Sequence, residues 1–383
     1  MQALDGNTVF AGGGCVARRS VDGGRSFTAM AFAPIEASCR AQLTSLSFVT
    51  PTLGWLLLSD GTVFTTDDGG ASFAQRTALP GTNASGGADM PDSVVFTSAT
   101  TGTASTSAGL FRTTDAGASW RAVNATGGLE LWFADADHGY AVGAARVLRS
   151  DDGGASWTPK DLGVAGVAYS SIRCAGTRLC VLTTADGGKL VRTTDGGDTP
   201  AEAITPSSAA VYAAAFASPT RIAALGARGT TVLSDDAGST FAPVGGALGG
   251  TYTGVFAGAN AGSAFAVGGN GGFAKTSDGG RAWTRGSVPT AAGLRAVSFP
   301  SATVGYALDG DGGLFRTANG GSSWKTLGTG STARGGAAGA VRRDRADGRR
   351  QRPAAFERRR RDLLARARES RRAARVRRHR RGT

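Results

Sequence analysis

Three arginines, a glutamate and a tryptophan are the residues of this chain whose types and positions best fit a binding site. Arg40, Arg173 and Arg295 lie at or near the start of short β-rich runs, and Glu130 and Trp132 occupy the equivalent run elsewhere. A guanidinium group forms paired, charge-assisted hydrogen bonds with a carboxylate. If these runs line a common funnel, the arginines converge there and predict a site for an acidic protein segment or a carboxylate ligand.

Carboxylates offer a second chemistry with less support in the sequence. Only three glutamates precede the C-terminal tail, so a carboxylate pair for glycoside hydrolysis would come from Glu130, Asp135 and Asp137. The run 135–139, Asp-Ala-Asp-His-Gly, has part of a calcium loop but lacks the third carboxylate and the distal glutamate, which favours a plain turn. We predict no metal and no cofactor, because His138 is the only histidine before the tail and no Cys-x-x-Cys occurs.

The elements that must position these residues are indicated by a phrase that recurs eight times. It reads Ser/Thr-x-Asp-Gly/Ala-Gly-x, usually followed by Ser or Thr and an aromatic residue, as in residues 66–73. Asp accepts hydrogen bonds from backbone N–H groups just ahead of it, and glycine tolerates positive φ, so each phrase predicts a tight turn. We call each eight-residue phrase a box. The third residues of the boxes are Asp22, Asp68, Asp115, Asp152, Asp195, Asp236, Asp278 and Asn319.

The boxes recur at intervals of 37–47 residues, which is typical of β-propeller blades built from four short strands. Each box predicts the hairpin between the third and fourth strands of a blade. Residues 42–328 give seven full blades, and residues 1–30 give only strands two to four of another. We therefore predict an all-β propeller of seven to eight four-stranded blades over residues 1–330. The missing first strand would come from the C-terminus or from upstream of Met1, and we favour a truncated start.

The four cysteines fall into two local pairs. Five residues separate Cys174 from Cys180 across one strand corner, a spacing that would place the two sulfurs within disulfide reach. Cys15 and Cys39 would form a second bridge near the seam of the ring. The alternative is four buried thiols. We favour disulfides, which indicate an oxidising compartment, although no signal peptide precedes the first strand.

The boxes and their spacing resemble the BNR, or Asp-box, repeat propellers, and their regularity is most similar to the photosystem II stability/assembly factor group. The resemblance covers residues 1 to about 328. It implies a monomeric, non-catalytic scaffold that binds proteins such as membrane-complex subunits, in the periplasm or outside the cell. Sialidases also carry such boxes, which implies a carbohydrate-active enzyme or carbohydrate-binding module as the alternative. However, the Arg-Ile-Pro motif of sialidases is absent.

Two boxes depart from the pattern. Pro200 replaces the aromatic residue of the fifth box and Asn319 replaces Asp in the eighth, which predicts weaker turns with the same role.

A cation stands immediately before six of the eight boxes. This repetition favours a structural role for the cation, with its stem on a neighbouring blade and its head in solvent. The alternative is a ring of cations that docks an anionic surface. The six residues are Arg19, Arg112, Arg149, Arg192, Lys275 and Arg316.

The net charge of +13 arises in the C-terminal tail, residues 331–383. Residues 341–383 contain 19 Arg, no Lys and five acidic residues, whereas the rest of the chain holds 23 basic and 24 acidic residues. We expect the tail to be disordered or partly helical. Three interpretations remain: out-of-frame translation of GC-rich DNA, which we favour, a solvated arm, or a segment that binds nucleic acid or anionic lipid through charge. No apolar run reaches the roughly 18–20 residues of a membrane helix.

Overall fold

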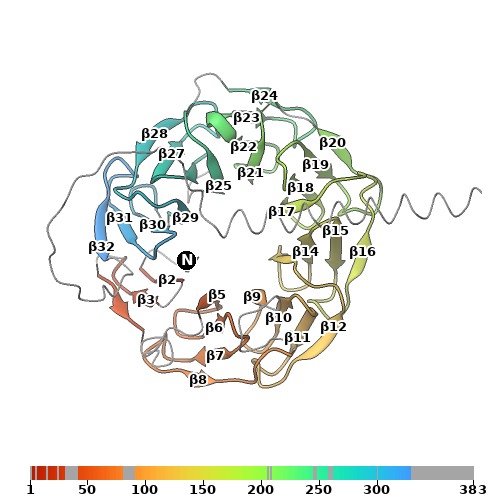
Figure 1. Cartoon of the computed structure of the whole chain (residues 1–383), viewed down its shortest axis with the longest axis vertical. Helices are drawn as coiled ribbons and strands as arrows, with labels where there is room; N and C mark the ends of the chain where they lie inside the picture. Colours follow the sequence, from red (N-terminus) through yellow and green to blue (C-terminus); the bar gives the residue numbers. More distant parts are fainter. Residues whose placement is uncertain are drawn as a thin grey trace, which may run out of the picture. The chain divides into compact units, whose positions relative to one another are not determined.

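The computed structural model describes residues 2–4, 7–13, 16–23, 26–30, 42–80, 91–204, 207, 209–244, 248–257, 262–299 and 301–328. The chain separates into two units, Met1–Gly330 and Ser331–Thr383, and the second lies outside the described residues together with the predicted tail. The first unit is a ring of eight four-stranded antiparallel sheets (Figure 1). The predicted all-β propeller is confirmed, with eight blades. No helix in the described ranges is both long and apolar enough to cross a membrane.

Each blade is a meander whose strands are paired in sequence order. Blades 1 to 4 consist of β1 (Gln2–Ala3), β2 (Val9–Gly13), β3 (Val16–Ser20) and β4 (Thr28–Ala29); β5 (Leu43–Phe48), β6 (Gly54–Leu58), β7 (Val63–Thr66) and β8 (Ala74–Gln75); β9 (Pro91–Phe96), β10 (Gly102–Thr106), β11 (Gly109–Thr113) and β12 (Arg121–Asn124); β13 (Glu130–Phe133), β14 (Gly139–Gly143), β15 (Arg146–Ser150) and β16 (Thr158–Lys160).

Blades 5 to 8 follow the same order, and the first strands, such as β5, β17 and β29, face the centre of the ring (Figure 1). Among the residues that the structure describes, one 3₁₀ turn occurs, η1 (Ala227–Gly229) in blade 6. The strands are β17 (Tyr169–Ala175), β18 (Leu179–Thr184), β19 (Leu190–Thr193) and β20 (Glu202–Ile204); β21 (Val211–Phe216), β22 (Ile222–Gly226), β23 (Thr231–Ser234) and β24 (Ala242–Pro243); β25 (Tyr252–Ala257), β26 (Ala264–Gly268), β27 (Gly272–Thr276) and β28 (Thr284–Ser287); β29 (Leu294–Ser298), β30 (Gly305–Asp309), β31 (Leu314–Thr317) and β32 (Lys325–Gly328).

The second strands are the most buried elements because each lies between two other strands and two neighbouring blades. Every residue of β6, β22 and β30 is buried. Where β6 begins, Gly54 lies under the ring of Phe48 at the end of β5, and a Cβ on Gly54 would lie 2.2 Å from that ring. The same Phe–Gly contact occurs between Phe299 and Gly305. The Phe–corner–Gly pattern of the sequence is therefore a packing requirement, since a larger residue would displace the aromatic ring.

Each box joins the third strand of its blade to the fourth, as predicted. In the box of blade 2, Thr66 Oγ1 donates to Asp68 Oδ1 (2.8 Å) and accepts from the Gly70 N–H (2.7 Å). Asp68 also accepts from the backbone and hydroxyl of Ser72, at 2.9 and 2.6 Å. One carboxylate thus fixes both sides of the turn.

The cation before a box contacts the next blade, and this corrects part of the sequence-based expectation. Its head group does not simply enter solvent but donates to a backbone carbonyl of the third or fourth residue of the following box. This satisfies a carbonyl that the tight turn leaves without a backbone partner. The six contacts are Arg19 to Asp68, Arg112 to Gly153, Arg149 to Asp195, Arg192 to Ala237, Lys275 to Gly320 and Arg316 to Gly23.

The prediction that the first blade lacks a first strand is wrong. β1 pairs with β2 through Gln2 opposite Phe10 and Ala3 opposite Val9, so residues 2–3 supply that strand. The sequence pattern missed it because two residues are too few to show an alternation. The side chain of Gln2 also links β1 to β5 of blade 2. Its Nε2 donates to the Phe48 carbonyl and its Oε1 accepts from the Phe48 N–H, both at 2.8 Å.

The ring closes between blades 8 and 1 through side chains. Tyr306 and Arg316 of blade 8 both donate to the carbonyl of Gly23 in the box of blade 1. The Phe27 ring of the same box lies edge-on to Tyr306, with centroids 5.9 Å apart. Blades 8 and 1 are therefore joined by the same kind of side-chain contact as the other neighbouring blades. No described strand of one blade pairs with the sheet of the other.

We expect Arg316→Met to lower the free energy of unfolding by about 1.5 kcal/mol, because it keeps the apolar stem and removes the charged donor to Gly23. Urea denaturation of the full chain measures this. Arg18→Met is the matched control, since the Arg18 side chain forms no hydrogen bond or ion pair within the described residues, and we expect a change within about 0.5 kcal/mol. Equal stability of Arg316→Met and the wild type would show that packing alone closes the seam.

Candidate functional site

Glu130 and Arg173, two of the predicted site residues, lie together on neighbouring first strands. Arg173 of β17 donates from Nη1 to Glu130 Oε1 of β13 (3.2 Å) and to the carbonyl of Ile172 (2.6 Å). The side chains of Arg173 and Glu130 are 38% and 41% exposed. An ion pair this accessible contributes little to stability but leaves both groups available to a ligand.

Trp132 lies beside this pair and supplies an apolar surface. It follows Glu130 by two residues on β13, so both side chains leave the same face of the strand. The Trp132 ring is partly buried against the apolar cluster of blades 4 and 5, and its centroid lies 6.3 Å from that of Tyr140. We call Glu130, Trp132 and Arg173 the channel trio; it combines an anchored aromatic ring with one exposed group of each charge.

Arg295 and Arg40, the other two predicted arginines, are not found beside the channel trio among the described residues. Arg295 lies on β29 in blade 8, three blades from Arg173, and Arg40 lies outside the described residues. A funnel of three converging arginines therefore stays a prediction. The partner of Arg173 is an acid on the neighbouring blade, which sequence reasoning placed in the same funnel without pairing the two.

A disulfide fixes the strand that carries Arg173. Cys174 and Cys180 lie directly opposite each other on β17 and β18, and their sulfurs are bonded at 2.08 Å. Cys180 is fully buried, whereas Cys174 is partly exposed. The bond joins the two strands one residue after Arg173, so it limits the movement of that side of the trio. Cys15 and Cys39 lie outside the described residues.

The box carboxylates have a structural role. Asp115 accepts from Thr113 Oγ1, Ser119 N–H and Ser119 Oγ at 2.7, 2.9 and 2.5 Å, and these bonds, that of the Ser119 hydroxyl foremost, lower the pKa of Asp115 to about 2. Bonds from Thr240 lower the pKa of Asp236 in the same way to about 2. A carboxylate held ionised by its own turn is a poor proton donor or acceptor near neutral pH.

Asn319 reproduces these contacts in the eighth box. Its Oδ1 accepts from Thr317 Oγ1 and from the Ser323 N–H, both at 2.9 Å, and its Nδ2 donates to Ser323 Oγ at 2.9 Å. The Ser323 hydroxyl becomes the acceptor where other boxes use a hydroxyl donor. The Asp-to-Asn departure thus keeps all three contacts without a charge.

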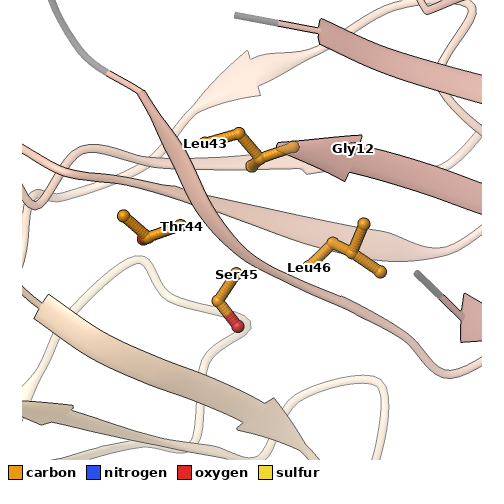
Figure 2. Close-up of a pocket in the computed structure, with 5 residues that line it drawn as sticks. All are labelled: Gly12, Leu43, Thr44, Ser45 and Leu46. Carbon is orange, nitrogen blue, oxygen red and sulfur yellow. The ribbon is translucent and has the colours of Figure 1, made fainter. Parts of the chain in front are cut away.

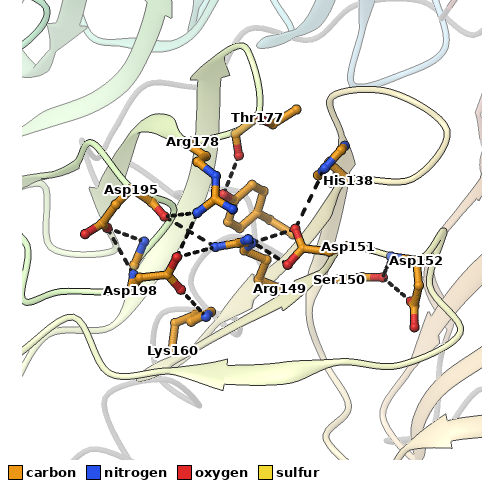
Figure 3. Close-up of polar contacts among 12 residues, drawn as sticks. His138, Arg149, Ser150, Asp151, Asp152, Lys160, Thr177, Arg178, Asp195 and Asp198 are labelled. Carbon is orange, nitrogen blue, oxygen red and sulfur yellow. Dashed lines mark hydrogen bonds and ion pairs between the residues drawn. The ribbon is translucent and has the colours of Figure 1, made fainter.

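A network of charges at the junction of blades 4 and 5 surrounds Arg149, whose side chain is 5% exposed (Figure 3). Arg149 forms a bidentate pair with Asp151, at 2.8 and 2.6 Å, and a third contact with Asp198 at 3.1 Å. Asp198 also accepts from Lys160 and Arg178, and the Lys160 and Arg149 bonds lead in lowering the pKa of Asp198 well below its usual range. Each of the three cations contacts one or both of the two aspartates, so the network is a structural joint between blades.

The run 135–139 forms a plain turn, as the sequence indicated. Asp135 Oδ1 accepts from the backbone N–H groups of Asp137 and His138, at 2.9 and 2.7 Å. The His138 ring contacts the same carboxylate at 2.9 Å. Within the described residues, no group of three or more His, Cys, Asp or Glu side chains fits a metal ion.

No family model and no curated protein matches the sequence. Solved structures similar to the chain are propellers. YCF48 from Cyanidioschyzon merolae is 20% identical with a TM-score of 0.56, over 72% of this chain and 95% of that chain. A structure described as YCF48 bound to D1 peptide is 18% identical with a TM-score of 0.54, over 68% and 85%. The C-terminal WD40 domain of Sif2 is 14% identical with a TM-score of 0.63, over 82% and 93%. At these identities the likeness shows the fold.

We expect the stability of the chain to be nearly constant above about pH 4 and to fall as the pH drops toward about 2. The pKa of Asp115 is about 2 in the folded chain against an ordinary value of 3.8, so its contribution is present above the unfolded value and is lost through the folded one. Urea denaturation between pH 2 and 6 measures this dependence.

Asp115→Asn with Asp236→Asn provides the control for this pH dependence. Asn319 shows that an amide keeps the turn, so the double variant should fold and lose stability less steeply below pH 4 than the wild type. Parallel stability curves for the two proteins would contradict the assignment.

Proposed function

We propose that this propeller is a non-catalytic scaffold that binds a segment of a partner protein at the channel trio. The observation that carries the proposal is the half-exposed Glu130–Arg173 pair beside Trp132 on the first strands of blades 4 and 5. Further support comes from the similarly folded YCF48, one structure of which is bound to D1 peptide. This chain and YCF48 share the fold, and the binding role for this chain rests on the trio.

The trio has the chemistry of a small protein-binding centre. Tryptophan and arginine are the residue types most enriched among those that dominate binding energy. Arg173 uses only Nη1 in its described contacts, so Nε and Nη2 are free to donate to a carboxylate or a main-chain carbonyl. Only one oxygen of Glu130 is used, which leaves the other for a backbone N–H or a cation. The site therefore fits a polar peptide segment with an apolar residue over Trp132.

We place the protein outside the cytoplasm, in the periplasm or secreted, and assign it membrane-complex subunits as partners and a monomeric state. The disulfide between Cys174 and Cys180 supports the location, since structural disulfides persist in oxidising compartments. The resemblance of the boxes to the photosystem II assembly group suggests the class of partner.

The carbohydrate-active alternative receives no comparable support. In the described part of the chain, Glu130 and Glu202 each pair with an arginine, Arg173 and Arg192. A sialidase site requires a glutamate beside a tyrosine, and neither glutamate forms that contact. The aspartates of the described boxes are used in turns.

Trp132→Ala and Arg173→Ala should each weaken binding of the native partner roughly 30-fold, because both remove a central contact worth about 2 kcal/mol. Capture of the partner from an extract of the native organism, followed by titration of the purified partner, measures the effect.

Arg281→Ala is the control for Arg173→Ala. Arg281 is also exposed and has one ion pair of similar length, 3.3 Å to Asp235, but it lies in the box of blade 7. We expect this variant to bind like the wild type. Equal loss with all three variants, or with none, would remove the trio as the binding centre.

The location predicts an oxidised Cys174–Cys180 pair in protein isolated from the native organism. Trypsin cleaves after Arg173, Arg178 and Lys189, so peptides 174–178 and 179–189 should appear joined and should separate on reduction. Thiols are alkylated before lysis. Alkylated Cys174 and Cys180 in the unreduced sample would contradict both the disulfide and export.

A further inference from the structure

In blade 5, a disulfide takes the place of a contact that four other blades make between a phenylalanine and a glycine. The phenylalanine lies at or directly after the end of the first strand, and its ring covers the glycine that begins the second strand. Cys174 and Cys180 occupy these two positions, because Cys180 lies opposite the first residue of its box as those glycines do. We call this bond the corner disulfide. The four contacts are Phe48–Gly54, Phe96–Gly102, Phe133–Gly139 and Phe299–Gly305.

The corner disulfide also lies beside Trp132 of the channel trio. Ser47 of β5 shows which residues face each other across neighbouring first strands, since its Oγ accepts from the Phe96 N–H of β9 at 2.9 Å. Trp132 has the register position of Ser47. On the next blade, Cys174 has the register position of Phe96. Because Trp132 and Cys174 also pack against one apolar cluster, the bond is adjacent to two members of the trio, Arg173 in sequence and Trp132 in space.

The corner that the bond closes, residues 175–179, carries contacts to both neighbouring parts of the junction (Figure 3). The Thr177 carbonyl accepts from the Tyr140 hydroxyl of blade 4 at 2.6 Å. Arg178 Nη1 donates to Asp198, in the box of blade 5, at 2.8 Å. A change in this corner would therefore reach the trio and the junction of blades 4 and 5 together.

The position of the bond favours a local role over a general contribution to stability. Five residues lie between the two cysteines, and a disulfide constrains the unfolded chain less when the loop that it closes is short. Four other blades hold the same corner without cysteine. Cys180 is fully buried, whereas Cys174 is partly exposed. Exposed disulfides are the ones that tend to be labile and regulatory.

We propose that the corner disulfide is a redox-sensitive switch of the channel trio. One thiolate of a dithiol reductant attacks the sulfur of Cys174, and the sulfur of Cys180 leaves as a thiolate that takes up a proton. The second thiolate of the reductant attacks the mixed disulfide, which releases Cys174 as a thiol and leaves the reductant as a disulfide. Two electrons and two protons pass in total from the dithiol to the two cysteines.

Reduction loosens the trio because the corner then has neither a disulfide nor a phenylalanine ring. Trp132 and Arg173 lose their fixed spacing, and the site releases its partner segment. In an oxidising compartment the pair is oxidised at rest, so the resting protein is the one that binds. This inference rests on the proposed protein-binding function and adds a regulation of the same site.

Amide hydrogen exchange of the full chain, before and after reduction with dithiothreitol, tests the switch. Alkylation and mass analysis of the tryptic peptides confirm that Cys174 and Cys180 are reduced. Residues 170–180 should exchange about tenfold faster or more in the reduced chain, while the remaining blades stay unchanged. The difference between the emission spectra of the wild type and Trp132→Phe isolates Trp132. Reduction should shift this emission to longer wavelengths, because the indole leaves an apolar contact for water.

The double variant Cys174→Ala with Cys180→Ala is the control for the other two cysteines. It has no corner disulfide, so dithiothreitol should leave the exchange of residues 170–180 unchanged. Residues 43–48 follow Cys39 by four positions and, with Gly12, line a pocket of about 190 Å³ on blades 1 and 2 (Figure 2). A change confined to this segment would report on Cys15 and Cys39 instead.

Three results would overturn the inference. They are a corner disulfide that excess dithiothreitol fails to reduce in the folded chain, a confirmed reduction that changes neither exchange nor Trp132 emission, and faster exchange in all eight blades. The last would show that the bond holds the whole fold. If a partner that depends on Trp132 and Arg173 binds both redox forms equally, only this inference fails. If the corner loosens while those variants bind normally, the proposed function fails and the switch acts on the corner alone.

Discussion

The structure depends on one hydrogen bond that is repeated around the ring. A carbonyl of the third or fourth residue of a box accepts from a side chain of the preceding blade at seven of the eight junctions. Where no cation precedes the box in blade 2, the indole N–H of Trp55 reaches the Ala116 carbonyl instead, at 2.9 Å. Between blades 6 and 7 an ion pair, Asp235 with Arg281, crosses the junction. The box is therefore both the turn of its own blade and the contact point for its neighbour.

This contact explains why a ring can close without a shared strand. Stability in a repeat protein comes from interfaces between neighbours as well as from each repeat, and blades 8 and 1 make the same interface as the rest. Gly23 accepts from two donors, Tyr306 and Arg316, where most boxes accept from one. Phe27 and Leu327 add apolar contacts to Ala11 and Leu308 at this seam. The chain thus concentrates donors at the junction that has no described covalent connection.

The repeat was predictable from the sequence because turns depend on local chemistry. The boxes predicted the number of blades to within one. The spacing of Cys174 and Cys180 predicted that these two residues lie opposite each other on neighbouring strands. The role of the cations was only half predictable, since a cation before six of the eight boxes shows that the position matters but not that its acceptor lies in the next blade. The Glu130–Arg173 pair was similarly hidden, because contact between first strands depends on the stagger of two blades. β1 was missed because two residues carry no pattern.

Polar side chains of the boxes and of the Arg149 network, which we call the rim, already have hydrogen-bond partners. This explains why a binding site is better sought on the first strands than at the rim. At the rim, box carboxylates are bonded by their own turns, and Arg149 and Asp198 neutralise each other within one network. A ligand there would have to replace existing bonds of similar strength, so it would gain little. On the first strands, Arg173 and Glu130 use only part of their bonding capacity. A ligand at these positions adds bonds without breaking others, which is the condition for net affinity.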